Sequence, residues 1–252
     1  MIPKIIHYCW LSDDPVPELL QKYMKTWKEK LPDYEFMLWN FERFDKTSSL
    51  WVSQAFDNKK YAFAADYIRL FAVYNHGGIY MDMDIEVLRN FDDLLDSDLL
   101  LAYEDDYEGG IEAGCFGASK HNVVIRNCLE YYENRGFVKD DGSFDMLPLP
   151  KIMIQYIRQY PELSIKNRYF FTCKSYFTGE ITKKEFSYAI HHFAGSWTSP
   201  DQQTFVAARR KLIDRFGTKI GAFLSLPAFC MWQIRDNGLK GFALKIWNKI
   251  KG

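Results

Sequence analysis

The sequence predicts an α/β fold, in which helices flank a sheet that contains parallel strands. The main reason is the order of the first elements: a β-branched and aromatic run at 4–10, a helical pattern from Pro17, and a second short run at 34–39. A strand, a helix and a strand in this order are typical of a parallel sheet. In addition, 252 residues with 48% hydrophobic content can bury a substantial core, so we expect a globular protein with one domain or one domain and an extension.

The remaining elements follow the same logic along the chain. The helix from Pro17 shows apolar residues at helical spacing and is closed by Pro32. The stretch 61–78 is typical of a helix that ends at glycine, and because it is apolar almost all the way round we expect it to be buried. We expect strands at 79–81, 85–88, 99–103, 114–119 and 188–193, and amphipathic helices at 121–134 and 150–160.

From about residue 201 the pattern changes to helix with a basic excess. We therefore expect a main domain at 1–200 and a helical extension at 201–252. In the last part of the extension, 236–252, apolar residues line one helical face and lysines supply charge, which fits an interfacial helix on an anionic membrane. A helix docked on the main domain explains the same pattern equally well.

Composition excludes several classes of protein. The chain has 32 Lys and Arg against 33 Asp and Glu, so no global field recruits nucleic acid. The five cysteines form no CxxC pair, which indicates reduced thiols, without a disulfide or a zinc site. The start of the chain does not resemble a secretory signal, and the apolar passage at 220–232 is well short of the roughly 20 residues of a membrane span. We expect a cytoplasmic protein, at most peripheral at the inner face of the cell membrane.

Two carboxylates, Asp82 and Asp84, end the apolar run GGIYMDMDIEV at 77–87. Residues two apart on a strand point the same way, so their charges repel unless a cation lies between them. Carboxylates suit Mg²⁺ or Mn²⁺, and such ions commonly keep phosphate oxygens in their shell. A DxD pattern is frequent by chance, and two solvated acids at a strand end are the alternative.

The preceding helix favours the metal hypothesis. Asp66 and Arg69 share a face of a helix that is otherwise apolar, and buried charges are costly unless they are paired or serve a polar ligand. They can simply pair with each other. However, this helix leads through a glycine turn directly into the DxD, so we expect both to line one cleft at the carboxyl edge of the sheet, where α/β proteins bind nucleotides.

The run AADYIRLFAVYNHGGIYMDMDIEVL resembles the sugar-transferase motif of glycosyltransferase family 32, which includes capsule and exopolysaccharide transferases, and more distantly that of the clostridial glucosylating toxins. The opening IPKIIHYCW and the late IHHFAGSW also resemble this family, so the resemblance covers about residues 1–200. It implies a fold of the GT-A type, with a mixed, mostly parallel sheet. It also implies a retaining hexosyltransferase that moves a sugar from a nucleotide-sugar donor, with a UDP-sugar favoured, to a saccharide or lipid-linked saccharide in bacterial surface polysaccharide synthesis.

The resemblance also implies roles for individual residues. Trp10 would stack on the nucleotide base, although a core tryptophan explains this position equally well. Asp66 and Arg69 would hold the sugar and the diphosphate of the donor, and the fork of an arginine suits phosphate oxygens. With Asp84 these two form the expected catalytic set. Ser196 and Trp197 would close over the diphosphate, their alternative being an ordinary turn.

The expected metal ligands are Asp82, Asp84 and a late histidine. His191 and His192 are adjacent on a predicted strand, so they face opposite sides and at most one enters the cleft. The continuation HFAG resembles the late motif of related GT-A enzymes, and this resemblance favours His192 over His191. The acidic loop at 104–106 is more typical of a solvated loop than of an acceptor site.

Two other functions fit a DxD after an apolar strand. In a phosphohydrolase Asp82 would be the nucleophile and Asp84 the acid, but that class places the motif on its first strand, whereas two strands and a buried helix precede it here. A catalytically inactive sugar-nucleotide-binding protein is the second alternative. Because Asp82, Asp84, Arg69 and a late histidine are all present, the inactive protein is the weaker hypothesis.

Overall fold

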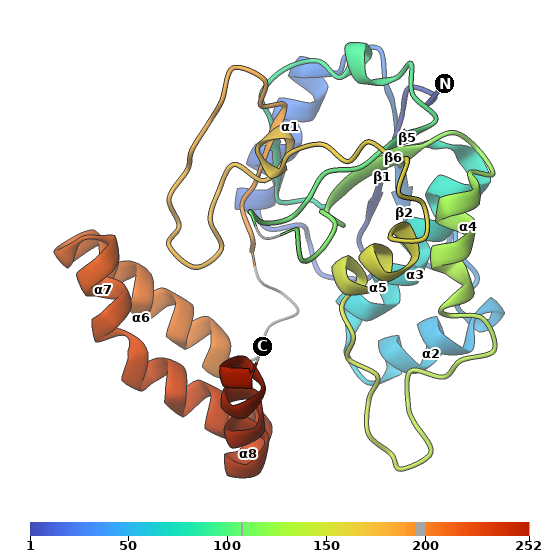
Figure 1. Ribbon diagram of the computed structural model, residues 1–252. Helices are drawn as coiled ribbons and strands as arrows, with labels where there is room; N and C mark the ends of the chain where they lie inside the picture. The colour runs from blue at the N-terminus through green and yellow to red at the C-terminus, as the bar shows by residue number, and fades with distance from the viewer. Residues whose placement is uncertain (107, 195–199, 252) are drawn as a thin grey trace. The chain divides into compact units, whose positions relative to one another are not determined.

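The computed structural model describes residues 1–106, 108–194 and 200–251 (Figure 1), with the backbone alone described at 200, 236–237, 240 and 242–251. The chain forms two compact units. The sheet unit comprises Met1–Cys173 and Thr182–His192, and the helical unit comprises Lys174–Ile181 and Phe193–Gly252. The functional boundary near residue 200 stays a prediction.

The sheet unit contains a mixed five-stranded sheet with the order β2-β1-β3-β6-β5. Strand β1 runs parallel to both β2 and β3, while β6 is antiparallel to β3 and to β5, so two of the four pairings are parallel. A second sheet pairs β4 with β7 in antiparallel register. The strands span, in chain order, Ile5–Cys9, Glu35–Trp39, Gly78–Met81, Ile85–Val87, Leu99–Leu100, Cys115–Ala118 and Ala189–His191.

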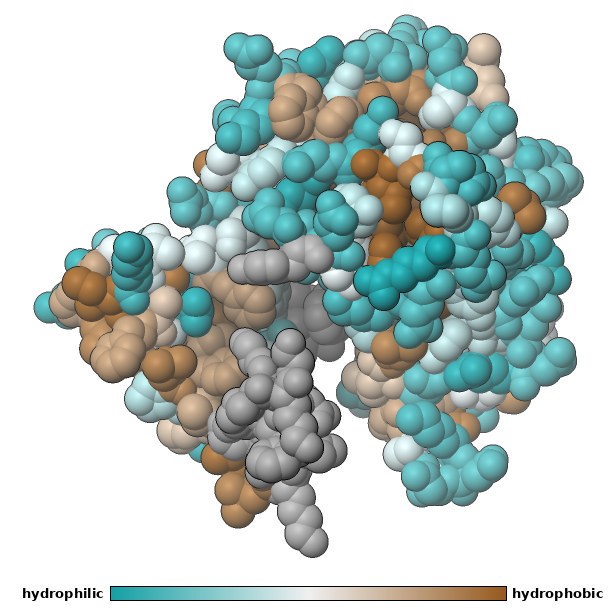
Figure 2. Space-filling view, in the orientation of Figure 1, coloured by the Kyte–Doolittle hydropathy of each residue, from teal (hydrophilic) through white to brown (hydrophobic). Residues whose placement is uncertain are grey.

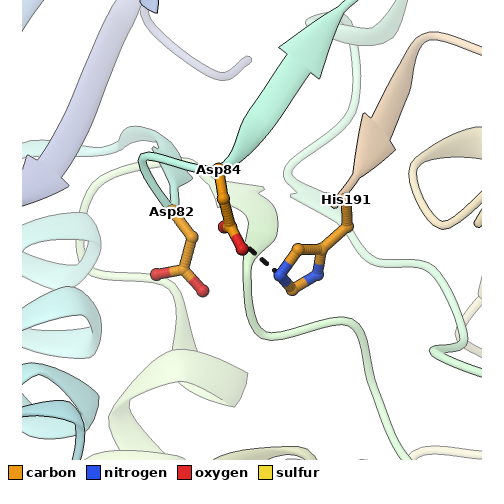
Figure 3. Close-up of side chains that lie close together, drawn as sticks. All are labelled: Asp82, Asp84 and His191. Atoms are coloured by element: carbon orange, nitrogen blue, oxygen red, sulfur yellow. Dashed lines mark ion pairs between the residues drawn. The ribbon is translucent and has the colours of Figure 1, made fainter. Parts of the chain in front are cut away.

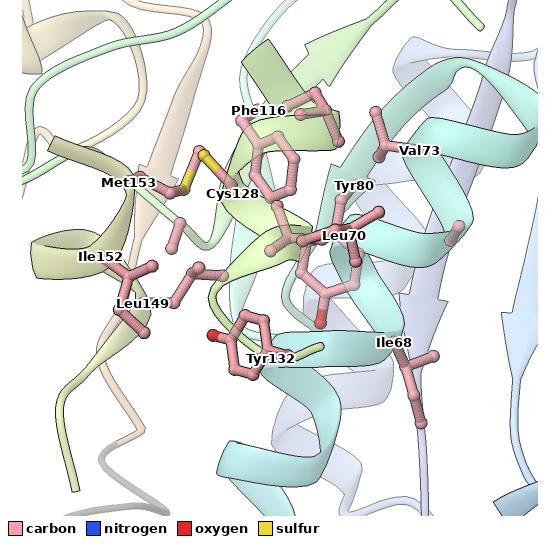
Figure 4. Packing of buried hydrophobic residues seen from close by; sticks show 14 of the residues in the cluster. Ile68, Leu70, Val73, Tyr80, Phe116, Cys128, Tyr132, Leu149, Ile152 and Met153 are labelled. Atoms are coloured by element: carbon pink, nitrogen blue, oxygen red, sulfur yellow. The ribbon is translucent and has the colours of Figure 1, made fainter. Parts of the chain in front are cut away.

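Helices cover both faces of the five-stranded sheet. One face packs on α3, α4 and α5 around a core that includes Ile68, Tyr80, Phe116 and Met153 (Figure 4). The other face packs on α1 through Trp27, which is 1% exposed. The helices of this unit are α1 (Glu18–Lys30), α2 (Leu50–Asp57), α3 (Tyr61–His76), α4 (Val123–Glu130) and α5 (Leu149–Ile157), and the short 3-10 helices are η1 (Lys46–Ser48), η2 (Asp92–Leu94) and η3 (Arg168–Phe170).

The glycine pair that ends α3 permits a sharp turn against the neighbouring strand. Gly77 and Gly78 have φ angles of 68° and 102°, a region that other residues rarely adopt. A Cβ on Gly78 would lie 2.6 Å from the carbonyl oxygen of Ile5 in β1. The chain can therefore leave α3 and enter β3 beside β1, which delivers the DxD to the carboxyl edge of the parallel strands.

Apart from shifted ends of α4, α5 and β7, the helices and strands of the sheet unit differ from the predicted ones mainly at α2 and β5. Helix α2 was not predicted from the sequence, although Ser49 caps it by accepting a hydrogen bond from the amide of Val52 and its apolar side is buried. Strand β5 is only Leu99–Leu100, because Ala102 and Tyr103 leave the sheet to bridge with Lys166 and Ile111.

The helices of the helical unit are α6 (Pro200–Phe216), α7 (Thr218–Leu224) and α8 (Leu226–Lys251). Gly238 breaks the helical backbone of α8 with a φ of 69°. Among the described residues no helix combines the length and the hydropathy that crossing a bilayer requires.

Candidate active site

The two acids of the DxD lie in the turn that joins β3 to β4, and not on a strand as the sequence suggested. The amide of Asp82 donates to the carbonyl oxygen of Gly114 at 2.8 Å, and the amide of Ile85 donates to the carbonyl oxygen of Asp82 at 3.0 Å. The carboxylates are thus brought together by a hydrogen-bonded turn. Strand alternation is not the cause.

Asp82, Asp84 and His191 form a cluster (Figure 3). One potential ligand atom from each lies within 4.8 Å of the others, and His191 Nε2 is 3.4 Å from Asp84 Oδ1. The side chain of Asp84 is 10% exposed, whereas that of Asp82 is 27% exposed. Two carboxylates and an imidazole match the ligand types that bind Mn²⁺, and the carboxylates alone suit Mg²⁺. The donor set therefore fits a divalent cation.

The histidine in this cluster is His191, whereas the sequence motif favoured His192. Strand β7 ends at His191, which pairs with Ile85, the residue directly after Asp84. His192 points elsewhere, because its Nε2 lies 2.7 Å from Glu86 Oε2 and its ring stacks on Tyr23 with centroids 4.2 Å apart. The expectation that the two histidines face opposite sides agrees with this geometry, and the candidate metal ligand changes to His191.

A buried carboxylate, Glu112, supports His191 from behind. Its oxygens lie 3.0 and 3.1 Å from His191 Nδ1, and it also accepts hydrogen bonds from the amide of Gly114 and the hydroxyl of Thr172. Burial raises the pKa of Glu112, but His191 and these donors together bring it below its ordinary value. Glu112 was missed from the sequence. Its signal is a lone charge inside the small and apolar run GGIEAGCFGA at 109–118.

Arg69 connects the DxD to helix α3. Its Nη1 donates to the carbonyl oxygen of Ala113 at 2.8 Å and lies 3.3 Å from Asp82 Oδ2, while its Nη2 lies 3.3 Å from Asp66 Oδ1. The guanidinium carbon also lies 4.6 Å from the centroid of the Tyr80 ring, whose hydroxyl donates to Asp82 Oδ1 at 2.8 Å. Arg69 therefore forms ion pairs with Asp66 and with Asp82. The pairing expected of Asp66 and Arg69 thus extends to one acid of the DxD.

Asp66 is buried on the same helix face. Burial raises its pKa to about 6, Arg69 opposes the rise and Asp82 adds to it. The structure thus brings Asp66, Arg69, Asp82 and Asp84 to one end of α3 and β3.

Trp10 follows β1 at the carboxyl edge of the parallel strands. Its Nε1 donates to the carbonyl oxygen of Asp14 at 2.8 Å, and its ring packs partly against the core beside α1. A cavity of about 360 Å³ lies here, lined by Trp10, Leu11, Ser12, Asp13, Leu38, Asn40, Phe41 and Glu42. Both interpretations of Trp10, as a core residue and as a stacking residue, are compatible with this position.

Ser196, Trp197 and the acidic loop are the remaining positions that the sequence singled out. Ser196 and Trp197 lie outside the described residues. In the acidic loop, Asp106 is exposed and accepts from Arg168 at 3.0 Å, as a solvated loop would, but burial and nearby Glu112 raise the pKa of Glu104 to about 7.

Comparison with known proteins places a family signature on this geometry. Residues 17–101 match the model of the glycosyltransferase sugar-binding region containing a DXD motif. The match includes Asp66, Arg69 and the DxD, whereas Glu112 and His191 lie beyond it.

Several curated proteins are similar to this chain. Inositol phosphoceramide mannosyltransferase 3 of Schizosaccharomyces pombe is 38% identical over 98 residues, which cover 37% of this chain and 27% of the relative. Mannosyl phosphorylinositol ceramide synthase SUR1 of Saccharomyces cerevisiae is 36% identical over 99 residues, with 38% and 26% coverage. Inositol phosphoceramide mannosyltransferase 2 of Schizosaccharomyces pombe is 26% identical over 261 residues, 93% of this chain and 66% of the relative. The chain thus spans about a quarter of the first two relatives' length.

A solved structure titled "PaToxG Glycosyltransferase" has a TM-score of 0.51 and 20% identity to this chain, and the likeness covers 64% of this chain and 70% of the other. It confirms the predicted mixed-sheet fold of the GT-A type. The chain therefore carries the DXD signature of a glycosyltransferase sugar-binding region on a GT-A fold, and these findings support a glycosyltransferase.

Proposed function

We propose that this protein is a metal-dependent retaining glycosyltransferase that uses a nucleotide-sugar donor. The observation that carries the proposal is the cluster of Asp82, Asp84 and His191, joined through Asp82 to the buried Arg69. Sugar transfer from a nucleoside diphosphate needs its developing negative charge to be stabilised, and a dication beside a buried arginine is suited to that task.

The residues of the cluster divide the work as follows. Asp82, Asp84 and His191 would hold Mn²⁺ or Mg²⁺, which neutralises charge on the leaving diphosphate when bound. Arg69 keeps Asp82 in place and presents a cation that does not lose its proton. Asp66, on the same helix face, would orient the donor sugar. The retaining outcome, with the acceptor attacking on the face that the diphosphate leaves, follows from the family resemblance.

The acceptor and the donor sugar are the finer parts of the proposal. The UDP-sugar preference and the role in bacterial surface polysaccharide synthesis come from the resemblance to family 32. The curated relatives are instead named for inositol phosphoceramide mannosylation. Both sources agree on a hexose and on an acceptor that is a saccharide or is linked to lipid, so that acceptor class is the one we propose.

The phosphohydrolase alternative requires a reactive Asp82 assisted by a lysine. Among the described residues, Asp82 is instead held by the Tyr80 hydroxyl and by Arg69, and no lysine contacts it. A carboxylate that is neutralised and hydrogen-bonded in this way is suited to metal binding more than to nucleophilic attack.

The test is donor hydrolysis by the purified protein. A panel of UDP- and GDP-hexoses is incubated with Mn²⁺, with EDTA, and with the variant Asp84→Asn, and released nucleoside diphosphate is measured. The proposal expects release with Mn²⁺ from at least one donor, and loss of release with chelator and in the variant. Orthophosphate release from a phosphomonoester would support the phosphohydrolase, and donor binding without release would support the inactive protein.

Cytoplasmic location and membrane contact through 236–252 stay predictions. Most side chains of that segment lie outside the described residues. The cytoplasmic location and the membrane contact are separate from the transfer reaction, and the hydrolysis test does not depend on either.

A further inference from the structure

The helical unit carries a charge opposite in sign to that of the sheet unit. It contains 11 Lys and Arg against 4 Asp and Glu, a formal charge of +7. Because the whole chain has a formal charge of -1, the sheet unit carries -8. The nearly neutral total therefore conceals a strongly basic unit, and the expected partner of such a unit is anionic.

Helix α7 in this unit exposes large apolar side chains on one face. Ile220, Phe223 and Leu224 are 58%, 71% and 44% exposed. Their spacing of three and four residues places them on the same side of the helix. Gly221, at the border of this side, is buried, and a Cβ there would lie 2.5 Å from the Cα of Ile213 in α6. Helix α7 thus packs on α6 along Gly221, while these three side chains, which we name the α7 face, remain exposed.

Basic side chains flank the α7 face. Between 209 and 224 the sequence has five Lys and Arg and a single acid, Asp214. Lys211, Arg215 and Lys219 recur every four residues and are exposed. Figure 2 shows hydrophobic surface, brown and tan, gathered over the helices of this unit beside hydrophilic patches. The surface therefore combines apolar side chains with a cationic border.

We propose that the α7 face, formed by Ile220, Phe223 and Leu224, docks on an anionic lipid bilayer. The apolar side chains enter the headgroup boundary while the neighbouring lysines and arginine meet the lipid phosphates. Nucleic acid would account for the positive charge, but not for phenylalanine, isoleucine and leucine side chains that reach solvent together. The surface lies before residue 236, so it is distinct from the predicted C-terminal membrane segment.

Vesicle co-sedimentation of the full chain tests this proposal without any donor or metal. Vesicles of phosphatidylcholine alone are compared with vesicles that also contain phosphatidylglycerol, at low and at high salt. We expect binding to the anionic vesicles only, reduced at high salt because screening weakens surface charge attraction. Ile220→Ser with Phe223→Ser, which leaves the charge unchanged, should weaken this binding by about tenfold or more.

A matched control separates the face from general surface hydrophobicity. Leu19→Ser with Val123→Ser removes two side chains that are 57% and 58% exposed in the sheet unit, and this variant should bind vesicles like the wild type. Circular dichroism and donor hydrolysis confirm that all variants are folded. Binding unchanged in the α7 variant, equal binding to neutral vesicles, or preferential binding to duplex DNA would overturn the proposal, whereas loss of donor hydrolysis alone would concern only the transferase function.

Discussion

His191 and His192 are adjacent, but they lie in two different regions of the sheet unit. His191 lies between Asp84 and the buried Glu112, next to Asp82. His192 lies against Glu86 and stacks on Tyr23 of α1. Both imidazoles have a carboxylate neighbour, so an acidic partner alone does not distinguish a metal ligand from a structural histidine.

The difference is in what surrounds each acid. Asp84 lies in a turn that also brings Asp82, and Glu112 holds the far nitrogen of His191, which leaves Nε2 facing the two aspartates. Glu86 is 33% exposed in its side chain and belongs to no group of metal-ligating side chains among the described residues. His191, the last residue of β7, is therefore placed where it could share a cation with two aspartates, whereas His192, the next residue, is held by a stacked ring.

The largest expected effect contrasts the two acids. Asp84→Asn removes one charge from the cluster without changing its size, and we expect donor hydrolysis to fall by about 10³-fold, on the order of 4 kcal/mol. Glu86→Gln makes the same change on the other side and should alter kcat/KM by less than about threefold. Steady-state kinetics with saturating Mn²⁺ measures both. Equal losses in the two variants would mean that the cluster has no special role.

The second prediction contrasts the two histidines through metal binding alone. His191→Ala should weaken Mn²⁺ binding by about 100-fold, because one of three ligands is lost, while His192→Ala should leave it within about threefold. Isothermal titration with Mn²⁺ and no donor gives both affinities. If His192→Ala weakened binding more, the motif-based preference for His192 would be restored.

The third prediction concerns the carboxylate behind His191. Glu112→Gln should weaken Mn²⁺ binding by about tenfold, since partners that orient a metal-ligating imidazole typically contribute 10- to 100-fold. Thr172→Val should have a smaller effect in the same direction, because it removes only one donor to Glu112. Asp106→Asn, which changes an exposed acid held by Arg168, serves as the control with unchanged affinity. A Glu112 variant that binds Mn²⁺ normally would assign this residue to the packing of the core.

The sequence predicted the part of the site that is local in the chain. Asp66, Arg69 and the DxD lie within 19 residues, so a helix, a glycine turn and a strand suffice to bring them together. His191 and Glu112 are 79 residues apart, and their contact depends on β7 pairing with β4 and on β6 pairing with β3. No local pattern encodes that pairing. The strand itself was predicted from its own residues, but which of the two histidines points towards the DxD was not.

The fold followed the same division. Periodicity predicted the buried helix α3 and the short strands, because each is decided by its own apolar residues. Helix α2 was not predicted because its eight residues, Leu50–Asp57, form too few turns to show a clear helical spacing of apolar residues. The basic excess from about residue 201 was predicted from the sequence, and the division into two units adds the opposite charge of the sheet unit, +7 against -8.

A third histidine, His7 in β1, is fully buried and extends the comparison of His191 with His192. Its expected effect is smaller and concerns only the stability of the fold. Its Nε2 lies 2.7 Å from the carbonyl oxygen of Gly77, and its Nδ1 accepts from the Trp39 indole at 3.1 Å. Burial lowers its pKa to about 4, the Gly77 carbonyl opposes this, and His76 and Arg43 lower it further. His7 is thus kept neutral as a structural link between β1, β2 and the end of α3.

This link predicts a pH dependence of stability. Because the pKa of His7 is lower in the folded protein than in the unfolded chain, the unfolded chain binds the extra proton first, and stability falls as pH drops from about 6.5 towards 4. Between about pH 7 and pH 5.5 the free energy of unfolding should decrease by about 1 kcal/mol more in the wild type than in His7→Gln, whose amide can make both hydrogen bonds without titrating. Urea unfolding at the two pH values measures this difference. An identical pH dependence in both proteins would show that His7 is not the group responsible, and a wild type that gained stability on acidification relative to the variant would reverse the predicted sign.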